Sequence, residues 1–288
     1  MRKLHYMLIL TMAAVISGCT EKKEMEFEPI DNSGYTVIEA DIESLLFDSQ
    51  ARLWPEDAYI GVYGSEMGEN ECYTIKEAGV GLKSATFYGP LVKGNIAAYY
   101  PYSPSYIGNA DGMPVMIETE QVFNPESDAV GHFQAYTPRA YGYMQNGKIG
   151  FVYPGGVLHV TVETYETLVV KSITVSSASS ALSGLGIFRN DGALDMTETS
   201  RKTVILDCGE GVASRNGDDF TDFYLVLVPG TYDDLEISIE LDGEAPFGRM
   251  LPPVEVKRIS AADFTIASVS ITAAGGPDDF IDTPVEFE

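Results

Sequence analysis

Cysteine, histidine and tryptophan are scarce in this chain of 288 residues, which has three cysteines, three histidines and one tryptophan. No set of cysteines and histidines has the spacing of a zinc site, and the chain has neither a Gly-x-Ser-x-Gly elbow nor a glycine-rich phosphate loop. His132 and His159 are far apart, and His159 lies among apolar residues of an expected strand, which is typical of a hydrogen-bonded structural histidine. We therefore expect no enzyme activity, no metal and no cofactor.

Positive charge is also scarce, because 18 lysines and arginines face 43 aspartates and glutamates and give a formal net charge of −25. Such a balance repels nucleic acid and anionic membrane surfaces, so we expect no nucleic-acid partner. The carboxylates gather at expected turns such as Asp233-Asp234, and none forms a calcium-loop pattern. Solvated turns are the favoured interpretation, and a hydrolase that uses a carboxylate pair is a third, weaker hypothesis for function.

The amino terminus carries a short apolar run but nothing long enough to cross a bilayer core, which needs roughly 20 residues. Arg2 and Lys3 precede the apolar residues 4–16, and Ser17-Gly18-Cys19 follows them. This pattern predicts a lipoprotein signal peptide over residues 1–18, cleaved between Gly18 and Cys19, with a lipid on the Cys19 thiol. An ordinary cleaved signal peptide with an incidental cysteine is the alternative. For Cys72 and Cys208 we expect buried thiols, although an exported protein could also pair them.

Helical periodicity is missing, whereas short β-rich segments alternate with turn signals that include 28 glycines and 15 prolines. In residues 235–241, apolar and polar side chains alternate as in an antiparallel strand with one buried face. The pattern predicts an all-β fold of antiparallel sandwiches with Greek-key connections. The expected strands are residues 35–40, 59–63, 95–100, 150–153, 157–162, 172–176, 223–228, 235–241 and 265–272, with short helical pieces only near 41–47 and 260–263.

The chain length predicts two consecutive β-sandwich domains after the leader. Residues 19–34 are polar and acidic, which predicts a flexible tether. We expect an N-terminal domain over residues 35–164 and a C-terminal domain with an acidic tail over residues 165–288.

Tyrosines cluster around two prolines in the segment that follows the third expected strand. Core packing is the favoured interpretation of this cluster, because a buried tyrosine ring is satisfied by one partner for its hydroxyl. If the rings are exposed, Tyr100 and Tyr102 are the candidates for contact with a sugar or a protein partner. The four tyrosines of this segment are Tyr99, Tyr100, Tyr102 and Tyr106.

An ordered set of motifs resembles the fimbrillin-like family. Residues 54–63 (WPEDAYIGVY) and residues 97–102 (AAYYPY) resemble two segments of the first half of these proteins. In the second half the resemblance lies in residues 156–162, 171–175, 223–230 and 235–241. The resemblance implies two transthyretin-like β-sandwich domains in a lipoprotein precursor of a fimbrial subunit of Gram-negative gut and oral anaerobes.

The resemblance also implies assembly by donor-strand exchange with other fimbrial subunits, in which a protease removes an N-terminal strand and a strand of the next subunit replaces it. On this chain the displaced strand would be residues 35–40, and Arg52 would be the processing site. The donor would be residues 265–272 or the tail 280–287, although Pro284 weakens the tail as a strand.

These observations predict a structural or adhesive subunit of a cell-surface fimbria, held in the outer membrane by its lipid until it is processed. The alternative is a monomeric surface lipoprotein that binds glycans through Tyr100 and Tyr102. Host or bacterial surface proteins are further possible partners.

Overall fold

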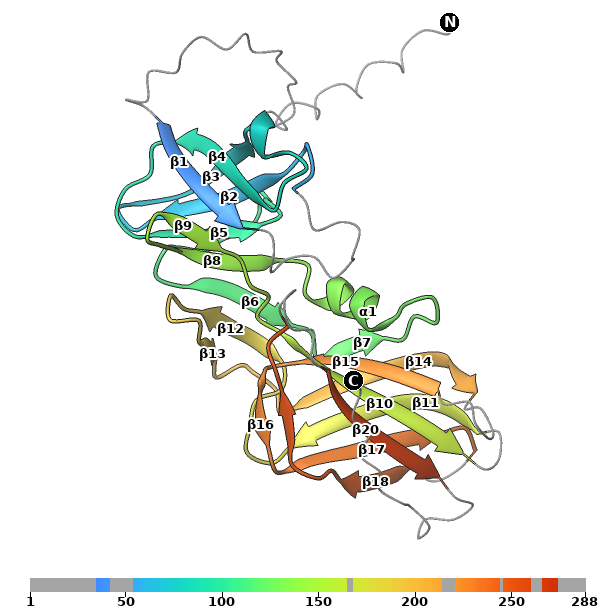
Figure 1. Ribbon diagram of the computed structural model, residues 1–288. Coiled ribbons are helices and arrows are strands. Elements are labelled where there is room, and N and C mark those ends of the chain that lie inside the picture. The colour runs from blue at the N-terminus through green and yellow to red at the C-terminus, as the bar shows by residue number, and fades with distance from the viewer. Residues whose placement is uncertain are drawn as a thin grey trace, which may run out of the picture.

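The computed structural model describes residues 35–41, 54–164, 168–213, 221–243, 246–259 and 266–273. The regular secondary structure of these residues is almost entirely β-strand, which confirms the all-β prediction (Figure 1). The signal peptide with Gly18 and Cys19, the tether, Arg52 and the acidic tail lie outside the described residues.

Seven strands of the first body form a sheet that closes on itself. Adjacent strands in this sheet are antiparallel, except that β1 and β9 run parallel. The transthyretin-like type of sandwich remains a prediction for this body. The strands, in spatial order, are β1 (Tyr35–Asp41), β4 (Ser84–Pro90), β3 (Met67–Ile75), β2 (Tyr59–Gly64), β5 (Ile96–Tyr100), β8 (Ala140–Gln145) and β9 (Lys148–Gly150).

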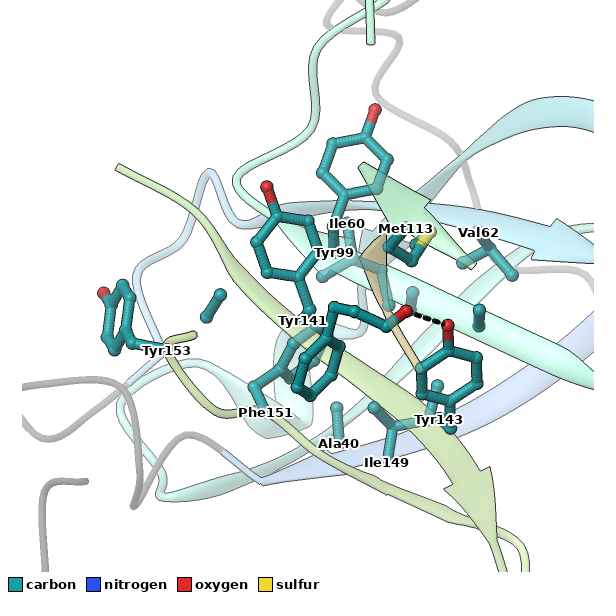
Figure 2. Packing of buried hydrophobic residues seen from close by; sticks show 14 of the residues in the cluster. Ala40, Ile60, Val62, Tyr99, Met113, Tyr141, Tyr143, Ile149, Phe151 and Tyr153 are labelled. Carbon is teal, nitrogen blue, oxygen red and sulfur yellow. Dashed lines mark hydrogen bonds between the residues drawn. The ribbon is translucent and has the colours of Figure 1, made fainter. Parts of the chain in front are cut away.

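The interior of this closed sheet is packed with aromatic and aliphatic side chains (Figure 2). Trp54 is almost fully buried and meets Phe87, Tyr100 and Phe151 edge-on, with ring centroids 4.8, 5.3 and 6.1 Å away. Ala40 of β1 pairs with Ile149 of β9, and both are fully buried. Edge-on aromatic pairs and close aliphatic packing hold these strands in one register.

The second body packs two sheets face to face around a second apolar core. Side chains from both sheets, such as Val160 and Ile173, are fully buried between them. One sheet has the order β15 (Thr221–Leu227), β10 (Gly156–Thr164) and β20 (Ala267–Ala273). The other has the order β18 (Phe247–Met250), β17 (Leu235–Leu241), β11 (Val169–Ser177), β14 (Thr203–Ala213) and β7 (Glu120–Val122).

Strands from both sides of the predicted boundary at residues 164 and 165 pair with one another. β6 (Met113–Ile117) pairs with β12 (Gly184–Phe188), which also pairs with β13 (Leu194–Met196). β7 pairs with β14, and β10 pairs with β15 and β20. The division into two domains at this boundary stays a prediction, and the observed strands interleave across it. A two-stranded sheet of β16 (Gly230–Tyr232) and β19 (Val254–Val256) completes the second body.

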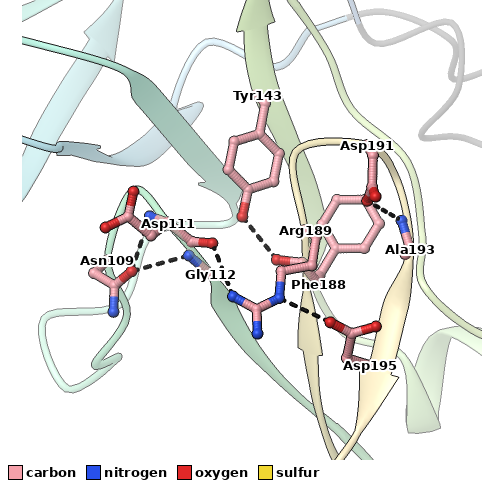
Figure 3. A network of polar contacts seen from close by, with 9 residues as sticks. All are labelled: Asn109, Asp111, Gly112, Tyr143, Phe188, Arg189, Asp191, Ala193 and Asp195. Atoms are coloured by element: carbon pink, nitrogen blue, oxygen red, sulfur yellow. Dashed lines mark hydrogen bonds and ion pairs between the residues drawn. The ribbon is translucent and has the colours of Figure 1, made fainter.

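A polar network joins the segment before β6 to the β12–β13 hairpin (Figure 3). The Arg189 guanidinium donates from Nε to Asp195 Oδ2 at 2.9 Å and from Nη1 to the Asp111 carbonyl at 3.3 Å. The Tyr143 hydroxyl of β8 donates to the Phe188 carbonyl of β12 at 2.7 Å. These contacts fix the hairpin against the closed sheet.

One helix, α1 (Ala129–Tyr136), lies where no helix was expected, and it packs against β15 and β10 (Figure 1). The Asp128 carboxylate caps it by accepting a hydrogen bond from the Gly131 N–H at 2.8 Å. His132 and Phe133 are buried on its inner face. A short 3₁₀ turn, η2 (Glu77–Gly79), precedes β4.

Candidate functional site

Strand β1 occupies the closing position of the first sheet, between β4 and β9. It pairs with β4 from Tyr35–Pro90 to Asp41–Ser84 and with β9 from Glu39–Lys148 to Asp41–Gly150. The other six strands of the ring all come after β1 in the chain and pair with one another without it. Removing β1 would therefore leave β4 and β9 as two unpaired edges.

Alternate side chains of β1 point into the core and away from it. Ile38 and Ala40 are fully buried, whereas Tyr35 and Val37 are 51% and 42% exposed. The Thr36 hydroxyl, on the inward side, accepts a hydrogen bond from the Val92 N–H at 3.0 Å. The inward sequence of β1 is therefore Thr-x-Ile-x-Ala, and a replacement strand must present side chains of similar size at these positions.

The two flanks of β1 hold it unequally. Its antiparallel pairing with β4 spans its whole length, but its parallel pairing with β9 covers only Glu39, Ala40 and Asp41. A partly exposed ion pair reinforces the short flank, because Lys148 Nζ lies 2.9 Å from Asp41 Oδ2 and 3.3 Å from the Ser84 hydroxyl. An ion pair of this exposure contributes at most about 1 kcal/mol. The β9 flank is the weaker one.

Strand β20 lies at one edge of the three-stranded sheet in the second body. Among the described residues it pairs with β10 alone, in parallel, from Leu158–Ala267 to Thr164–Ala273. Val269 and Ile271 are its buried side chains. The order of residues at alternate positions, Val269, Ile271 and Ala273, matches Thr36, Ile38 and Ala40 in size.

The two tyrosines proposed for ligand contact, Tyr100 and Tyr102, lie in different environments. Tyr100 is half-buried beside Trp54, and burial raises the pKa of its hydroxyl. Tyr102 is half-buried and stacks on Tyr99, with ring centroids 6.5 Å apart. The structure therefore brings Tyr102 into a tyrosine cluster and leaves Tyr100 outside it.

We call the rings of Tyr63, Tyr99, Tyr102, Tyr106 and Tyr141 the tyrosine cluster. Its buried members are fixed by hydrogen bonds: the Tyr99 hydroxyl donates to the Ser103 carbonyl at 2.7 Å, and the Tyr63 hydroxyl donates to the Tyr106 carbonyl at 2.8 Å. Asn70 donates to the Tyr99 hydroxyl at 3.0 Å. Burial raises the pKa of Tyr63 and Tyr141 to about 12, so their hydroxyls stay neutral at physiological pH.

His159 connects three strands of the second body. Its Nε2 lies 2.8 Å from Asp222 Oδ1 on β15, and its Nδ1 lies 3.2 Å from the Ser268 hydroxyl on β20. The buried ring stacks on Tyr224 at 4.9 Å. This is a satisfied structural environment of the kind expected for His159, and it ties β20 to β10 and β15.

Cys208 on β14 is buried as expected, whereas Cys72 on β3 is only half-buried, and no disulfide joins them. Burial raises the pKa of the Cys208 thiol to about 12, which makes it a poor nucleophile. Among the residues that the structure describes, no three histidine, cysteine or acidic side chains gather as a metal site. In the same part of the chain, no helix has the length and hydrophobicity needed to cross a membrane.

Two residues with unusual environments carry no signal in the sequence. Gln121 is fully buried and bonds through its side-chain amide to the main chain of Val226. Arg139 lies over the ring of Tyr106, with its guanidinium carbon 5.5 Å from the ring centroid. Only the folded arrangement brings these partners together.

No protein-family model and no curated protein matches the chain. Among solved structures it is similar to a candidate cell adhesion protein from Bacteroides ovatus, with 13% identity over 88% of this chain and 96% of that one and a TM-score of 0.48. It is also similar to a fimbrial protein from Bacteroides vulgatus (10% identity, 86% and 98% coverage, TM-score 0.47) and to a tip fimbrial protein from Porphyromonas gingivalis (10% identity, 86% and 97% coverage, TM-score 0.37).

These neighbours are described as fimbrial or cell adhesion proteins.

Proposed function

We propose that this chain is a structural subunit of a cell-surface fimbria that assembles by exchange of strand β1. The observation that carries the proposal is the closing position of β1 between β4 and β9. Loss of β1 would open one continuous slot with hydrogen-bonding edges on both sides and an apolar floor. A strand from a second copy of the chain would fill that slot, and repetition of the contact would build a filament.

In this proposal β20 of the next subunit is the donor. Its alternate residues Val269, Ile271 and Ala273 reproduce the sizes of Thr36, Ile38 and Ala40. Valine and threonine are close in volume, and the other two pairs are identical. In addition, β20 has one neighbouring strand among the residues that the structure describes, so its release breaks one ladder rather than two.

Export and processing complete the proposal. Cys19 would carry the lipid that holds the precursor at the outer membrane, and cleavage after Arg52 would free both the anchor and β1. A structural role without catalysis is consistent with the small number of histidines in the chain and with the raised pKa of the Cys208 thiol.

The experiment is limited digestion of the purified precursor with an arginine-specific protease, followed by unheated gel electrophoresis in SDS. We expect cleavage at Arg52 and a ladder of heat-sensitive oligomers. Arg52→Gln should remove the cut and the ladder together. Ile271→Asp should keep the cut but abolish the ladder, because a carboxylate cannot enter the apolar slot.

A synthetic peptide of residues 266–274 should compete with the ladder, and the same peptide with Asp at positions 269 and 271 is the matched control. A protein that stays monomeric after clean loss of β1 would contradict strand exchange as its mode of assembly.

A second candidate function is sugar binding by a surface lipoprotein. The observation in its favour is that Tyr102 and Tyr106 are the half-buried members of an otherwise buried tyrosine cluster, so part of each ring reaches the surface. Tyr100 fits this role less well because it packs beside Trp54. Binding of a glycan array by the full chain, with Tyr102→Ala and Tyr100→Ala as paired variants, tests this candidate.

A further inference from the structure

Strand β20 is held in its own sheet by side chains as well as by its ladder with β10. His159 of β10 lies opposite Ser268 of β20 on one side and opposite Tyr224 of β15 on the other. The His159 Nδ1 lies 3.2 Å from the Ser268 hydroxyl, and the His159 ring stacks on that of Tyr224 with centroids 4.9 Å apart. One buried imidazole thus joins the donor strand of the proposed function to the other two strands of its sheet.

The polar contacts of His159 fix the direction of its hydrogen bond to β20. Its Nε2 lies 2.8 Å from Asp222 Oδ1, and an ionised carboxylate can only accept. In the neutral ring the proton is therefore on Nε2, and Nδ1 accepts a hydrogen bond from the Ser268 hydroxyl. Because His159 is only 6% exposed, this bond is shielded from competition by water. Asp222 thus orients the ring, and the ring holds Ser268.

The opened β1 slot of a second copy would compete with this sheet for β20. In the register of the proposed exchange, Val269 and Ile271 take the inward positions of Thr36 and Ile38, so apolar side chains are buried in either place. The slot has a strand edge on both sides, whereas β10 is the one strand paired with β20 among the described residues. Backbone pairing would therefore favour the slot, and what retains β20 is a contact that its own sheet offers and the slot lacks.

Ser268 makes such a contact. In the register of the exchange it would occupy the outward position of Tyr35, which lies opposite Pro90 of β4. The proline ring has no hydrogen-bonding group and Tyr35 is half exposed, so in the slot the Ser268 hydroxyl would be left to water. The bond to His159 is thus lost on exchange and regained only when β20 returns to its own sheet.

The chain just before β20 is fixed elsewhere. Ile259 is fully buried in the core of the first body, and its N–H donates to the Gly155 carbonyl at 3.2 Å. The Arg258 guanidinium donates from Nη2 to the Gly192 carbonyl. Its guanidinium carbon also lies 5.4 Å from the centroid of the Phe188 ring. None of these contacts involves β20, so they can persist when the strand leaves its sheet.

We propose that Asp222, His159 and Ser268 form a latch that retains β20 in its own sheet until the slot of a second copy opens. Arg258 and Ile259 anchor the chain from which β20 is then released. This inference rests on the proposed exchange of β1 for β20. It adds the side-chain contact that sets how readily the donor strand is released, and it also predicts a property of the uncut protein, in which β1 still closes the slot.

The test is hydrogen–deuterium exchange of the full, uncut chain, read by mass spectrometry of its peptides. Ser268→Ala removes the latch, and we expect the amides of residues 267–273 to exchange about fivefold faster than in the parent chain, as the loss of one hydrogen bond implies. Peptides of β1 and of residues 254–259 should exchange at the parent rate, because the anchor holds the chain before β20. Ser270→Ala, two residues further along the same face of β20, is the matched control and should behave like the parent.

A second variant removes the latch from the other strand. His159→Phe keeps a ring that can stack on Tyr224 and removes both nitrogen contacts, so it should loosen β20 at least as much as Ser268→Ala. If one of the two variants does not fold, the other decides the outcome. Exchange of β20 at the parent rate in the folded variants would overturn the latch, and faster exchange that extends to residues 254–259 would overturn the anchor.

The ladder assay separates the latch from the proposed function. Once β1 is lost, Ser268→Ala should form the ladder about fivefold faster than the parent, because its hydroxyl has no partner in the slot. A ladder that forms at the parent rate, although β20 exchanges faster, would overturn the role of the latch in donor release. If parent and variant both form no ladder while β20 of the variant exchanges faster, strand exchange is contradicted and the retention of β20 by Ser268 is supported.

Discussion

The side-chain amide of Gln121 bonds to both main-chain groups of Val226, its carbonyl and its N–H. Its Nε2 donates to the Val226 carbonyl at 2.7 Å, and its Oε1 accepts from the Val226 N–H at 2.9 Å. Val226 lies on β15, the outer strand of its sheet. The amide therefore fills a position that another strand would otherwise occupy, and it protects the edge of β15.

Gln121→Ala should lower the free energy of unfolding by about 3 kcal/mol, because the buried N–H and carbonyl of Val226 and the ring of His132 would all lose their partner. Urea denaturation followed by circular dichroism measures the loss. Gln134→Ala, at an exposed position of α1, is the control and should change stability by less than about 0.5 kcal/mol. An equal effect of both variants would refute the role of Gln121.

Stability should fall as the pH drops through the range set by His132. Its Nε2 lies 2.9 Å from Gln121 Oε1, its ring packs 4.8 Å from that of Tyr136, and burial lowers its pKa from 6.5 to about 4. The folded state therefore resists protonation that the unfolded state accepts. Between pH 6.5 and 4 this difference removes about 3 kcal/mol of stability, and above pH 6.5 it is constant.

Comparison of the parent chain with His132→Gln isolates this contribution from that of the carboxylates. Unfolding free energies at pH 7 and pH 4.5 should differ more for the parent than for the variant. Parallel pH profiles for the two proteins would show that His132 does not titrate in this way.

The two faces of β1 should respond differently to truncation. Ile38→Ala should cost about 3 kcal/mol, because Ile38 is fully buried and its loss leaves a cavity in the closed sheet. Val37→Ala, one residue away, should change stability by less than about 0.5 kcal/mol since Val37 is 42% exposed. Thermal or urea unfolding of the two variants distinguishes the faces, and similar losses would argue against the observed register.

Gly61 permits the close approach of β2 to Tyr99. A β-carbon at this position would lie 2.0 Å from Cε1 of the Tyr99 ring. Gly61→Ala should therefore displace the tyrosine cluster and cost about 1–3 kcal/mol. Near-ultraviolet circular dichroism reports the tyrosine environment, and urea unfolding reports the cost. Gly68→Ala, where nothing lies within 4 Å of the added carbon, should leave both measurements unchanged.

Local patterns in the sequence predict those strands whose two faces differ. The alternation in residues 235–241 defines β17 with the observed bounds, and residues 35–40 agree with β1 to within one residue. β3 was not expected because its first residues, Met67, Gly68 and Glu69, are exposed and provide no apolar face. Helix α1 was missed because buried contacts, such as that of Phe133, stabilise a short segment of weak helical pattern.

Contacts between distant segments could not be predicted from the sequence. Gln121 and Val226 are 105 residues apart, and nothing in the type or spacing of either residue indicates that they meet. The same holds for Arg139, whose guanidinium lies over the ring of Tyr106 from another part of the chain. Sequence patterns report burial and turns, whereas these pairings follow from the path of the whole chain.

The parallel pairing of β20 with β10 has a mechanical consequence. A pulling force applied beyond Ala273 acts along β20, and the pairs from Leu158–Ala267 to Thr164–Ala273 would bear it together in shear. An antiparallel hairpin pulled at its open end would instead lose its pairs in succession. The bridge from His159 to Ser268 adds a cross-link of side chains to this ladder. While β20 stays in its own sheet, a force along its axis therefore loads the whole ladder at once.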